Sequence, residues 1–280
     1  MNILEVKGLN KNYPSFRLQN VTLSLEKGKI TGFIGRNGAG KTTTLKSMFR
    51  IVHPDSGSIC FFGQDVKDHE LDIKKRVGFA AGGIDYYPLK KIKEITTVTK
   101  LFYPQWDDAA YSHYMSLFHL DENKTPKQLS AGMKVKYTLT LALSHRAELL
   151  VLDEPTSGLD PVSRDELLDI FMDLCKKGIT VFFSTHITSD LDKCADNIIY
   201  IQNGKILAES NMDSFIKAYK IVEVSNDGVT PELKEKAVGI KRTKSGYSAL
   251  IRSSDAAYFS MPKTDADLES IMVHIEREGE

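Results

Sequence analysis

Long apolar runs, an excess of charge of one sign and paired cysteines are all missing from this sequence of 280 residues. The longest apolar stretches, residues 149–152 and 179–183, fall far short of the roughly 20 residues that a membrane-spanning helix needs. The N-terminus also lacks the charged start and apolar run of a secretory signal. We therefore expect a protein that neither spans a membrane by itself nor is exported.

The balance of charge and the few cysteines limit the expected binding partners and the cellular compartment of the protein. Because 37 basic residues face 37 acidic ones, no overall attraction to nucleic acid or anionic lipid is expected. Cys60, Cys175 and Cys194 show no metal-ligand or C-x-x-C spacing, which predicts free thiols in a reducing compartment. A hydrophobic share of 41% suffices for one large core and a small appendage.

Strand and helix patterns alternate along most of the chain, which predicts an α/β fold. Helical spacing replaces the strand signals between residues 78 and 146, and we expect an inserted helical subdomain over about 86–146. The remaining expected elements are strands at 18–25, 29–34, 149–152, 179–184, 197–201 and 205–208, and helices at 41–49, 164–176 and 189–194.

Beyond residue 218 the pattern changes to short strands and amphipathic stretches, with a hairpin-like turn at Lys244-Ser245-Gly246. This predicts a main domain over 1–218 and a small C-terminal α+β domain over 219–280. No repeat and no low-complexity tract is visible, so solenoids and disordered linkers are not expected.

Residues 35–42, GRNGAGKT, match the pattern G-x-x-x-x-G-K-[ST]. In such a loop, glycines let backbone N–H groups close around phosphate oxygens at the start of a helix. Lys41 would reach the β- and γ-phosphates, and Thr42 would bind Mg²⁺. An apolar strand precedes the loop and a helix follows it, so a nucleotide site is favoured over an ordinary glycine-rich turn.

Two further polar positions follow apolar runs. Residues 149–152 lead into Asp153 and Glu154, and residues 180–185 lead into His186. Ligand sites of open α/β sheets lie at the carboxyl ends of strands. Asp153 is predicted to hold Mg²⁺, and Glu154 to orient or deprotonate the attacking water. Taken alone, such a carboxylate pair is more often a solvated sheet edge, and a lone histidine is more often structural.

Taken in order, these motifs resemble the ATPase subunit of ABC transporters over about residues 1–215. The resemblance rests on Tyr13, GRNGAGKTT at 35–43, LSAGM at 129–133, DEPTSGLD at 153–160 and His186. It implies a P-loop ABC-type ATPase core that hydrolyses ATP with Mg²⁺. The residues that it implies in ATP binding at the loop are Gly35, Asn37, Gly38, Ala39, Gly40, Lys41, Thr42 and Thr43.

The resemblance also assigns roles outside the loop. Tyr13 would stack on adenine, although an ordinary core tyrosine is the alternative. Ser130 and Gly132 would contact the γ-phosphate of ATP held by a second subunit, where the plain alternative is a helix start. Asp160 would link the two sites across a dimer, and His186 would hold the γ-phosphate and the attacking water.

The sequence departs from the family pattern in two places. The usual LSGGQ carries Ala131 and Met133 here, so we expect retained but altered activity. The Gln that usually follows the lysine by about forty residues is missing, and we hypothesise that Gly82 takes its place, with water or Asp85 completing the metal shell. Tyr86, Tyr87, Pro88, Lys90, Lys91 and Lys93 fall where the family docks its membrane subunit, with a solvated basic loop as the alternative.

The resemblance implies partners as well: a transmembrane permease on a separate chain at the cytoplasmic face of the membrane, and a homodimer or a related ATPase. The run FYPQWD at 102–107, the missing Gln and the C-terminal appendage are similar to ATPase subunits of bacterial exporters of antimicrobial or toxic peptides, such as phenol-soluble modulins. The appendage would tether the dimer, contact the permease or bind a regulator.

Two other functions were weighed. A soluble ABC-type ATPase acting on ribosomes or nucleic acid usually has two cassettes or long coiled coils, whereas this chain has one cassette and no basic excess. A P-loop kinase or GTPase would leave residues 129–132 unexplained, and no guanine-reading Asn-Lys-x-Asp is present.

Overall fold

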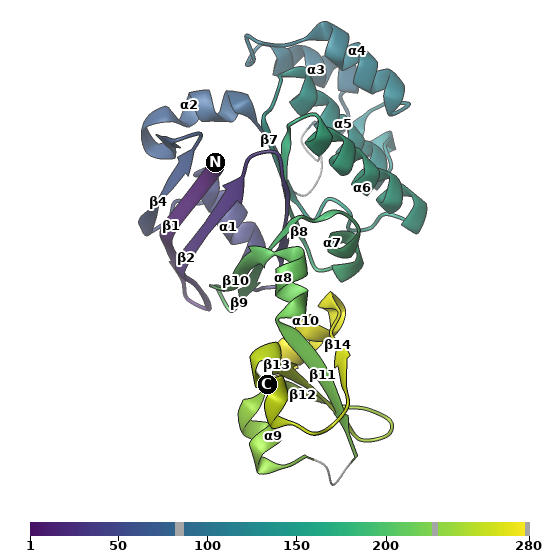
Figure 1. The fold of residues 1–280 in the computed structure, drawn as a ribbon. Coiled ribbons are helices and arrows are strands. Elements are labelled where there is room, and N and C mark those ends of the chain that lie inside the picture. The colour runs from purple at the N-terminus through teal and green to yellow at the C-terminus, as the bar shows by residue number, and fades with distance from the viewer. Residues whose placement is uncertain (82–86, 226–228, 278–280) are drawn as a thin grey trace. The chain divides into compact units, whose positions relative to one another are not determined.

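The computed structural model describes residues 1–81, 87–225 and 229–277, drawn as a ribbon in Figure 1. The chain divides into two compact units, Met1–Ala208 and Glu209–Glu280. The expected division into domains of 1–218 and 219–280 stays a prediction. In the described part of the chain no helix is long and apolar enough to cross a membrane, and the three cysteines are free thiols.

A six-stranded sheet with the order β10-β9-β3-β8-β7-β6 positions the site. β3 pairs in parallel with β8 and β9, and β7 pairs in parallel with β6 and β8. The carboxyl ends of these strands therefore meet at one edge, as the sequence predicted. The strands are β3 Ile30–Ile34, β6 Val77–Ala81, β7 Leu149–Asp153, β8 Thr180–Thr185, β9 Asn197–Gln202 and β10 Lys205–Asn211.

A second, antiparallel sheet has the order β2-β1-β4-β5. Its strands are β1 Asn2–Tyr13, β2 Phe16–Glu26, β4 Ser56–Phe61 and β5 Gln64–Asp65. Residues of this sheet, such as Leu4 and Val21, share one core with Val151 and Phe182 of the parallel sheet and Leu45 of α1. Burying apolar faces of both sheets in one core fixes the antiparallel sheet beside the parallel one.

Seven helices are described in the first unit, and several of them begin at a capping side chain. The seven are α1 Lys41–Met48, α2 Val66–Arg76, α3 Ile92–Lys100, α4 Asp108–Leu117, α5 Ala131–Ser144, α6 Pro161–Lys176 and α7 Thr188–Cys194, with a 3₁₀ turn at Pro126–Gln128. Asp107, Ser130 and Asp160 cap α4, α5 and α6 through their side chains. Within the helical insertion, Tyr137 connects α5 to α3, because its hydroxyl donates a hydrogen bond to Ile92 O at 2.9 Å.

The helical pattern expected from residue 78 begins later than predicted, because residues 77–81 form strand β6. Val77 pairs with Leu149 and Gly78 with Leu150 in parallel register. A Cβ atom on Gly78 would lie 2.5 Å from Ala142 Cβ, so α5 packs closely over this strand. A short run containing glycine and alanine has little strand propensity of its own, and pairing with β7 decides its conformation.

The second unit is a small α+β fold of its own. Strands β11 Tyr219–Val224, β12 Ala237–Arg242, β13 Tyr247–Arg252 and β14 Lys263–Asp265 form a sheet in the order β12-β13-β11-β14. Three helices, α8 Met212–Lys217, α9 Pro231–Lys236 and α10 Leu268–Arg277, and the 3₁₀ segment Ser253–Tyr258 accompany it. Val222, Leu233 and Ile251 form part of its separate apolar core.

Candidate functional site

The glycine-rich loop between β3 and α1 leaves the first turn of that helix open to an anion. Gly40 forms the N-cap with φ of 111°, and neither a capping side chain nor an acidic residue occupies the first turn. A Cβ atom on Gly40 would also lie 2.7 Å from Leu18 Cδ2, so both conformation and space require glycine. The helix dipole and the N–H groups of this turn therefore favour a bound phosphate.

The loop is anchored at both ends. A Cβ atom on Gly35 would lie 2.2 Å from Ile201 O, which shows how closely the loop passes over β9. Ala39 is buried, and its carbonyl accepts a hydrogen bond from Gly204 N at 3.0 Å. Residues 36–38, including Asn37 and Gly38, form the exposed rim, and Thr42 and Thr43 lie on the first turn of α1. Close packing of Gly35 and the hydrogen bond of Ala39 therefore anchor the loop on either side of its exposed rim.

Lys41 is buried, with 6% of its surface exposed, and within the described ranges it is the only buried lysine or arginine. Its Nζ donates to Gly35 O at 2.7 Å and lies 3.2 Å from Glu154 Oε1. A buried ammonium group needs hydrogen bonds and a counter-charge. Glu154 supplies that negative charge here. A phosphate oxygen is also negatively charged, so it can take the place of Glu154 beside Lys41.

Asp153 ends β7, Glu154 follows it, and the hydroxyl group of Ser184 contacts both residues. Glu154 has φ of 51°, a left-handed conformation that residues other than glycine rarely adopt. Ser184 lies opposite Asp153 in register on β8. Its Oγ donates to Asp153 Oδ1 at 2.6 Å and accepts from Glu154 N at 2.9 Å. The buried Ser184 therefore orients both the Asp153 carboxylate and the strained backbone that carries Glu154.

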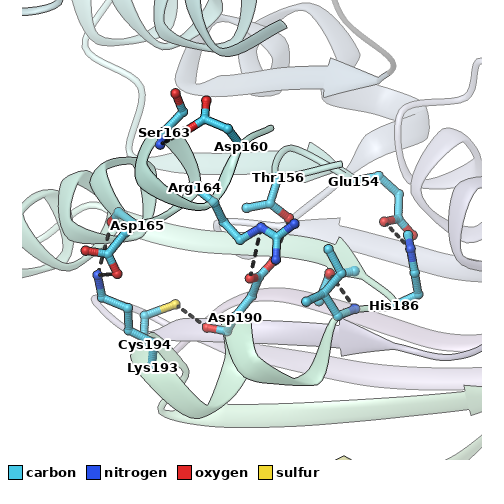
Figure 2. A network of polar contacts seen from close by, with 12 residues as sticks. Glu154, Thr156, Asp160, Ser163, Arg164, Asp165, His186, Asp190, Lys193 and Cys194 are labelled. Atoms are coloured by element: carbon cyan, nitrogen blue, oxygen red, sulfur yellow. Dashed lines mark hydrogen bonds and ion pairs between the residues drawn. The ribbon is translucent and has the colours of Figure 1, made fainter. Parts of the chain in front are cut away.

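His186 follows β8 and lies beside Glu154, as Figure 2 shows. Its Nδ1 donates to Glu154 Oε2 at 2.8 Å. Glu154 is thereby contacted by Lys41 through one oxygen and by His186 through the other. This arrangement supplies a carboxylate that can accept a proton from water, together with an ammonium and an imidazole that can stabilise charge on phosphoryl oxygens.

The predicted signature residues lie at the start of α5. Ser130 is the N-cap, and its Oγ accepts from Met133 N at 3.2 Å. The start of α5, together with Asp153 and Glu154 at the end of β7, lines a cavity of about 400 Å³. Met133 contributes its backbone to the helix cap, and the altered activity expected from its side chain stays a prediction.

Asp160 caps α6 next to this signature. Its Oδ1 accepts from the backbone N–H groups of Val162 and Ser163 at 3.0 Å each, and hydrogen bonding to the Ser163 side chain holds the pKa of Asp160 below its usual value. A Cβ atom on Gly132 would lie 3.6 Å from Leu159 Cδ2, so the two helix starts are neighbours. Ser130 and Asp160 are both exposed.

Tyr13 ends β1 and pairs across the β1–β2 turn with Phe16. Its ring is 39% exposed, with Lys11 Nζ 5.7 Å from the ring centroid. A Cβ atom on Gly40 would lie 2.8 Å from Phe16 Cζ, which places this turn beside the phosphate loop. A partly exposed aromatic ring there is suited to stacking on a base.

The structure describes only part of the predicted metal-binding and permease-docking region. Gly82, Asp85 and Tyr86 lie outside the described residues. The strand that precedes them ends at Ala81, which pairs with Asp153.

Ser184 and the contacts among Thr156, Arg164 and Asp190 were not predicted from the sequence. The only local signal for Ser184 is a hydroxyl group within an otherwise apolar strand next to His186. Thr156 belongs to the motif at 153–160 but was given no role, and no motif marks Arg164 or Asp190, because their contacts join residues up to 34 positions apart.

Comparison with known proteins decides the family. The sequence model of a family described as "ABC transporter" matches residues 18–157. The lantibiotic transport ATP-binding protein SrtF of Streptococcus pyogenes is 34% identical over 219 residues, which cover 75% of this chain and 92% of that protein. This chain belongs to the ABC transporter ATP-binding proteins.

Two more comparisons agree with this ABC family membership. The bacitracin transport ATP-binding protein BcrA of Bacillus licheniformis is 32% identical over 219 residues, 77% of this chain and 72% of that protein. A solved structure described as the ATP-binding subunit of an ABC transporter is 27% identical, with a TM-score of 0.68 over 76% of this chain and 91% of that one.

The expected ABC-type ATPase fold is therefore confirmed. This ABC protein is an ATPase and the ATP-binding subunit of a transporter. Membership excludes the kinase or GTPase interpretation. Because the relatives are named as transport proteins, it also disfavours a soluble ATPase acting on ribosomes or nucleic acid.

Proposed function

We propose that this ATPase powers the export of peptides or similar toxic compounds through a separate membrane permease, and that two ATP-binding subunits close around two ATP molecules. The contact series Lys41, Glu154 and His186 carries the catalytic part of the proposal. The export direction is supported by relatives named for lantibiotic and bacitracin transport. Association with the cytoplasmic face of the membrane then follows from the permease.

The proposed hydrolysis uses groups that the fold already holds in place. Backbone N–H groups of residues 38–43 bind the phosphates, and Lys41 leaves Glu154 for a phosphate oxygen. Freed from that ion pair, the Glu154 carboxylate accepts the proton of the attacking water. His186 keeps this carboxylate oriented through Nδ1 and presents its other ring nitrogen to the γ-phosphate. Tyr13 stacks on the base.

The donor set at the strand end fits Mg²⁺, which prefers one or two carboxylates together with phosphate and water oxygens. Asp153 and the hydroxyl of Thr42 would hold it, and the described ranges contain no cluster of three or more His, Cys, Asp or Glu that could bind a metal by itself. When bound, Mg²⁺ supplies positive charge to the phosphate oxygens.

Ser184→Ala tests whether the orientation of these carboxylates matters. Removing the Oγ takes one hydrogen bond from Asp153 and one from the backbone of Glu154. We expect kcat to fall roughly 10-fold and the Mg²⁺ concentration for half-maximal ATP binding to rise by a similar factor, as for other groups that orient metal ligands.

Ser184→Thr is the matched control, because it keeps the hydroxyl group, and it should stay near the wild-type values. Equal Mg²⁺ dependence in wild type and Ser184→Ala would contradict the proposed orientation.

An apolar groove in the helical subdomain is the proposed docking site for the permease. Its volume is about 590 Å³. The groove is lined by Tyr87, Lys90, Glu94, Ile95, Val98, Thr99, Phe102 and Tyr103. Phe102 is 70% exposed, which is unusual for a large aromatic residue in a free surface and typical of an interface. Lys91 and Lys93 are also exposed next to it, so we expect a short permease segment with apolar and acidic side chains.

Phe102→Asp should separate permease binding from ATP hydrolysis. Loss of an aromatic anchor costs about 2 kcal/mol, so we expect roughly 30-fold weaker binding to the permease. The hydrolysis rate of the isolated subunit should stay within about twofold of wild type. Leu117→Asp is the control, since Leu117 is also exposed, at 53%, in the helical subdomain but does not line the groove. Equal loss of binding in both variants would argue against the groove.

The export function itself is tested in cells. A susceptible bacterium that expresses this ATPase with its permease should tolerate higher concentrations of bacitracin-like or lantibiotic-like peptides, and Glu154→Gln in the same strain should remove that tolerance. Accumulation of labelled peptide in inverted membrane vesicles on addition of ATP would establish the direction. Unchanged tolerance with an active, assembled complex would overturn peptides as the substrate class.

A further inference from the structure

Asp190 is the only buried carboxylate in the part of the chain that the structure describes, with 1% of its surface exposed. It lies on α7, four residues after His186, and the catalytic scheme above gives it no role. A charged group that is removed from water needs a specific reason to be there, because burial without compensation is costly. The contacts of Asp190 supply that reason.

Asp190 joins two other segments of the fold. Thr156 Oγ1 donates to Asp190 Oδ2 at 2.6 Å, and Thr156 is itself fully buried. Arg164 of α6 directs its guanidinium group at the other oxygen, with Nε 3.8 Å from Oδ1. Figure 2 shows Arg164 and Thr156 reaching Asp190 from the same side.

The ion pair is incomplete. Arg164 Nε and Asp190 Oδ1 are both buried, and neither has a hydrogen-bond partner. They face each other at a distance that allows charge attraction but exceeds a hydrogen bond. Two unsatisfied buried atoms of opposite charge, separated by less than 1 Å beyond bonding distance, form a contact that a small movement of α6 toward α7 completes.

Thr156, Arg164 and Asp190 also connect the loop that follows Glu154 with the helix that follows His186. Thr156 follows Glu154 by two residues in the loop that ends at Asp160, and Arg164 N donates to Asp160 O at 3.0 Å on the first turn of α6. Asp190 lies on the first helix after His186. Asp160 is thus connected through Arg164 and Asp190 to the segment that follows His186.

The charges around Asp190 affect the pKa of its carboxyl group in both directions. Burial raises the pKa of the Asp190 carboxyl, and the charge of Glu154 acts in the same direction. The hydrogen bond from Thr156 and the charges of Arg164 and His186 oppose the rise in pKa. Arg164 therefore compensates the buried charge of Asp190.

We propose that Asp190 and Arg164 are positioning residues for ATP hydrolysis: when a second subunit contacts Asp160, the pair closes to hydrogen-bond distance and holds His186 and the loop after Glu154 in their reactive arrangement. Neither residue touches the reacting atoms. The proposal rests on the ATP-driven dimer proposed above, and it adds the element through which one subunit senses the other.

The test compares Asp190→Asn with the double variant Asp190→Asn, Arg164→Met. Asparagine keeps an acceptor for Thr156, and methionine keeps much of the apolar length of Arg164. The single variant leaves Arg164 without a counter-charge, so we expect its thermal midpoint to fall by about 5 °C. In the double variant both charges are gone, and the midpoint should return to within about 2 °C of wild type.

In the double variant, the rate of ATP hydrolysis should stay low although the thermal midpoint recovers. In the double variant we expect kcat to stay at least roughly 10-fold below wild type, with KM for ATP within about threefold, as expected when orientation rather than binding is lost. The Hill coefficient for ATP should fall from near 2 toward 1. Recovery of both kcat and the Hill coefficient together with the thermal midpoint would overturn the proposal, because the pair would then be structural only.

A second ion pair between the same helices provides a matched control. Lys193 of α7 contacts Asp169 of α6 at 2.8 Å and also pairs with Asp165, but it does not touch Thr156. Lys193→Met should leave kcat and cooperativity within twofold of wild type. An equal loss of kcat in Lys193→Met would overturn the special role of Asp190. Wild-type hydrolysis with no cooperativity and no ATP-dependent dimer would instead refute the proposed dimer.

Discussion

Glu154→Gln should reduce ATP hydrolysis by roughly 10²- to 10⁴-fold while ATP binding persists, because the amide cannot accept a proton from the attacking water. Its oxygen and nitrogen still fill the space between Lys41 and His186. In the ATP-free state the buried ammonium of Lys41 loses the carboxylate 3.2 Å away. Bound phosphate then replaces a missing counter-charge, so ATP should raise the thermal midpoint of this variant more than that of wild type.

The measurement that follows is molecular mass by light scattering, with and without ATP and Mg²⁺. Blocking hydrolysis should trap the closed pair, so Glu154→Gln should shift from monomer to dimer with ATP. Glu26→Gln serves as a control, because Glu26 is an exposed residue at the end of β2. Hydrolysis near the wild-type rate in Glu154→Gln would assign the base to another group. Binding without dimerisation would indicate that Ala131 and Met133 weaken self-association or that the natural partner is a different subunit.

Lys41→Met should weaken ATP binding by roughly 100-fold or more, the second large effect. The ammonium is held in place by Gly35 O before ATP arrives, so little entropy is lost when it meets a phosphate. Each charge-assisted hydrogen bond contributes about 1.5–3 kcal/mol, and Lys41 has more than one donor for phosphate oxygens. The variant also removes the positive charge that compensates Glu154.

Equilibrium binding of a fluorescent ATP analogue measures this effect directly. Lys46→Met on the last turn of the same helix is the control, since it also replaces a lysine of α1 but leaves the loop contacts of Lys41 unchanged. Tight binding to Lys41→Met, with only kcat reduced, would mean that the backbone N–H groups of the loop hold the phosphates by themselves and that Lys41 acts on the reaction alone.

The elements with local signals were predicted closely. The apolar run, the glycines and the helix around residues 30–48 lie within one stretch of chain, and the conformation of each follows from neighbours in sequence. β7 and β8 were predicted for the same reason, since a buried parallel strand shows as a continuous apolar run. β6 was not, because Gly78 and Ala80 carry no strand signal until β7 and α5 cover them.

Short sequence patterns were enough to predict a nucleotide site at residues 35–42 and to mark Asp153, Glu154 and His186 as polar residues that follow apolar strands. Each of these depends on a short pattern whose chemistry needs those residues next to one another. Three contacts emerged only in the folded chain: Glu154 stands between Lys41 and His186, Ser184 holds the Asp153 carboxylate and the Glu154 backbone, and Arg164 faces Asp190. Such contacts depend on strand register and helix packing, which bring distant residues within hydrogen-bond reach and leave no periodic trace in the sequence.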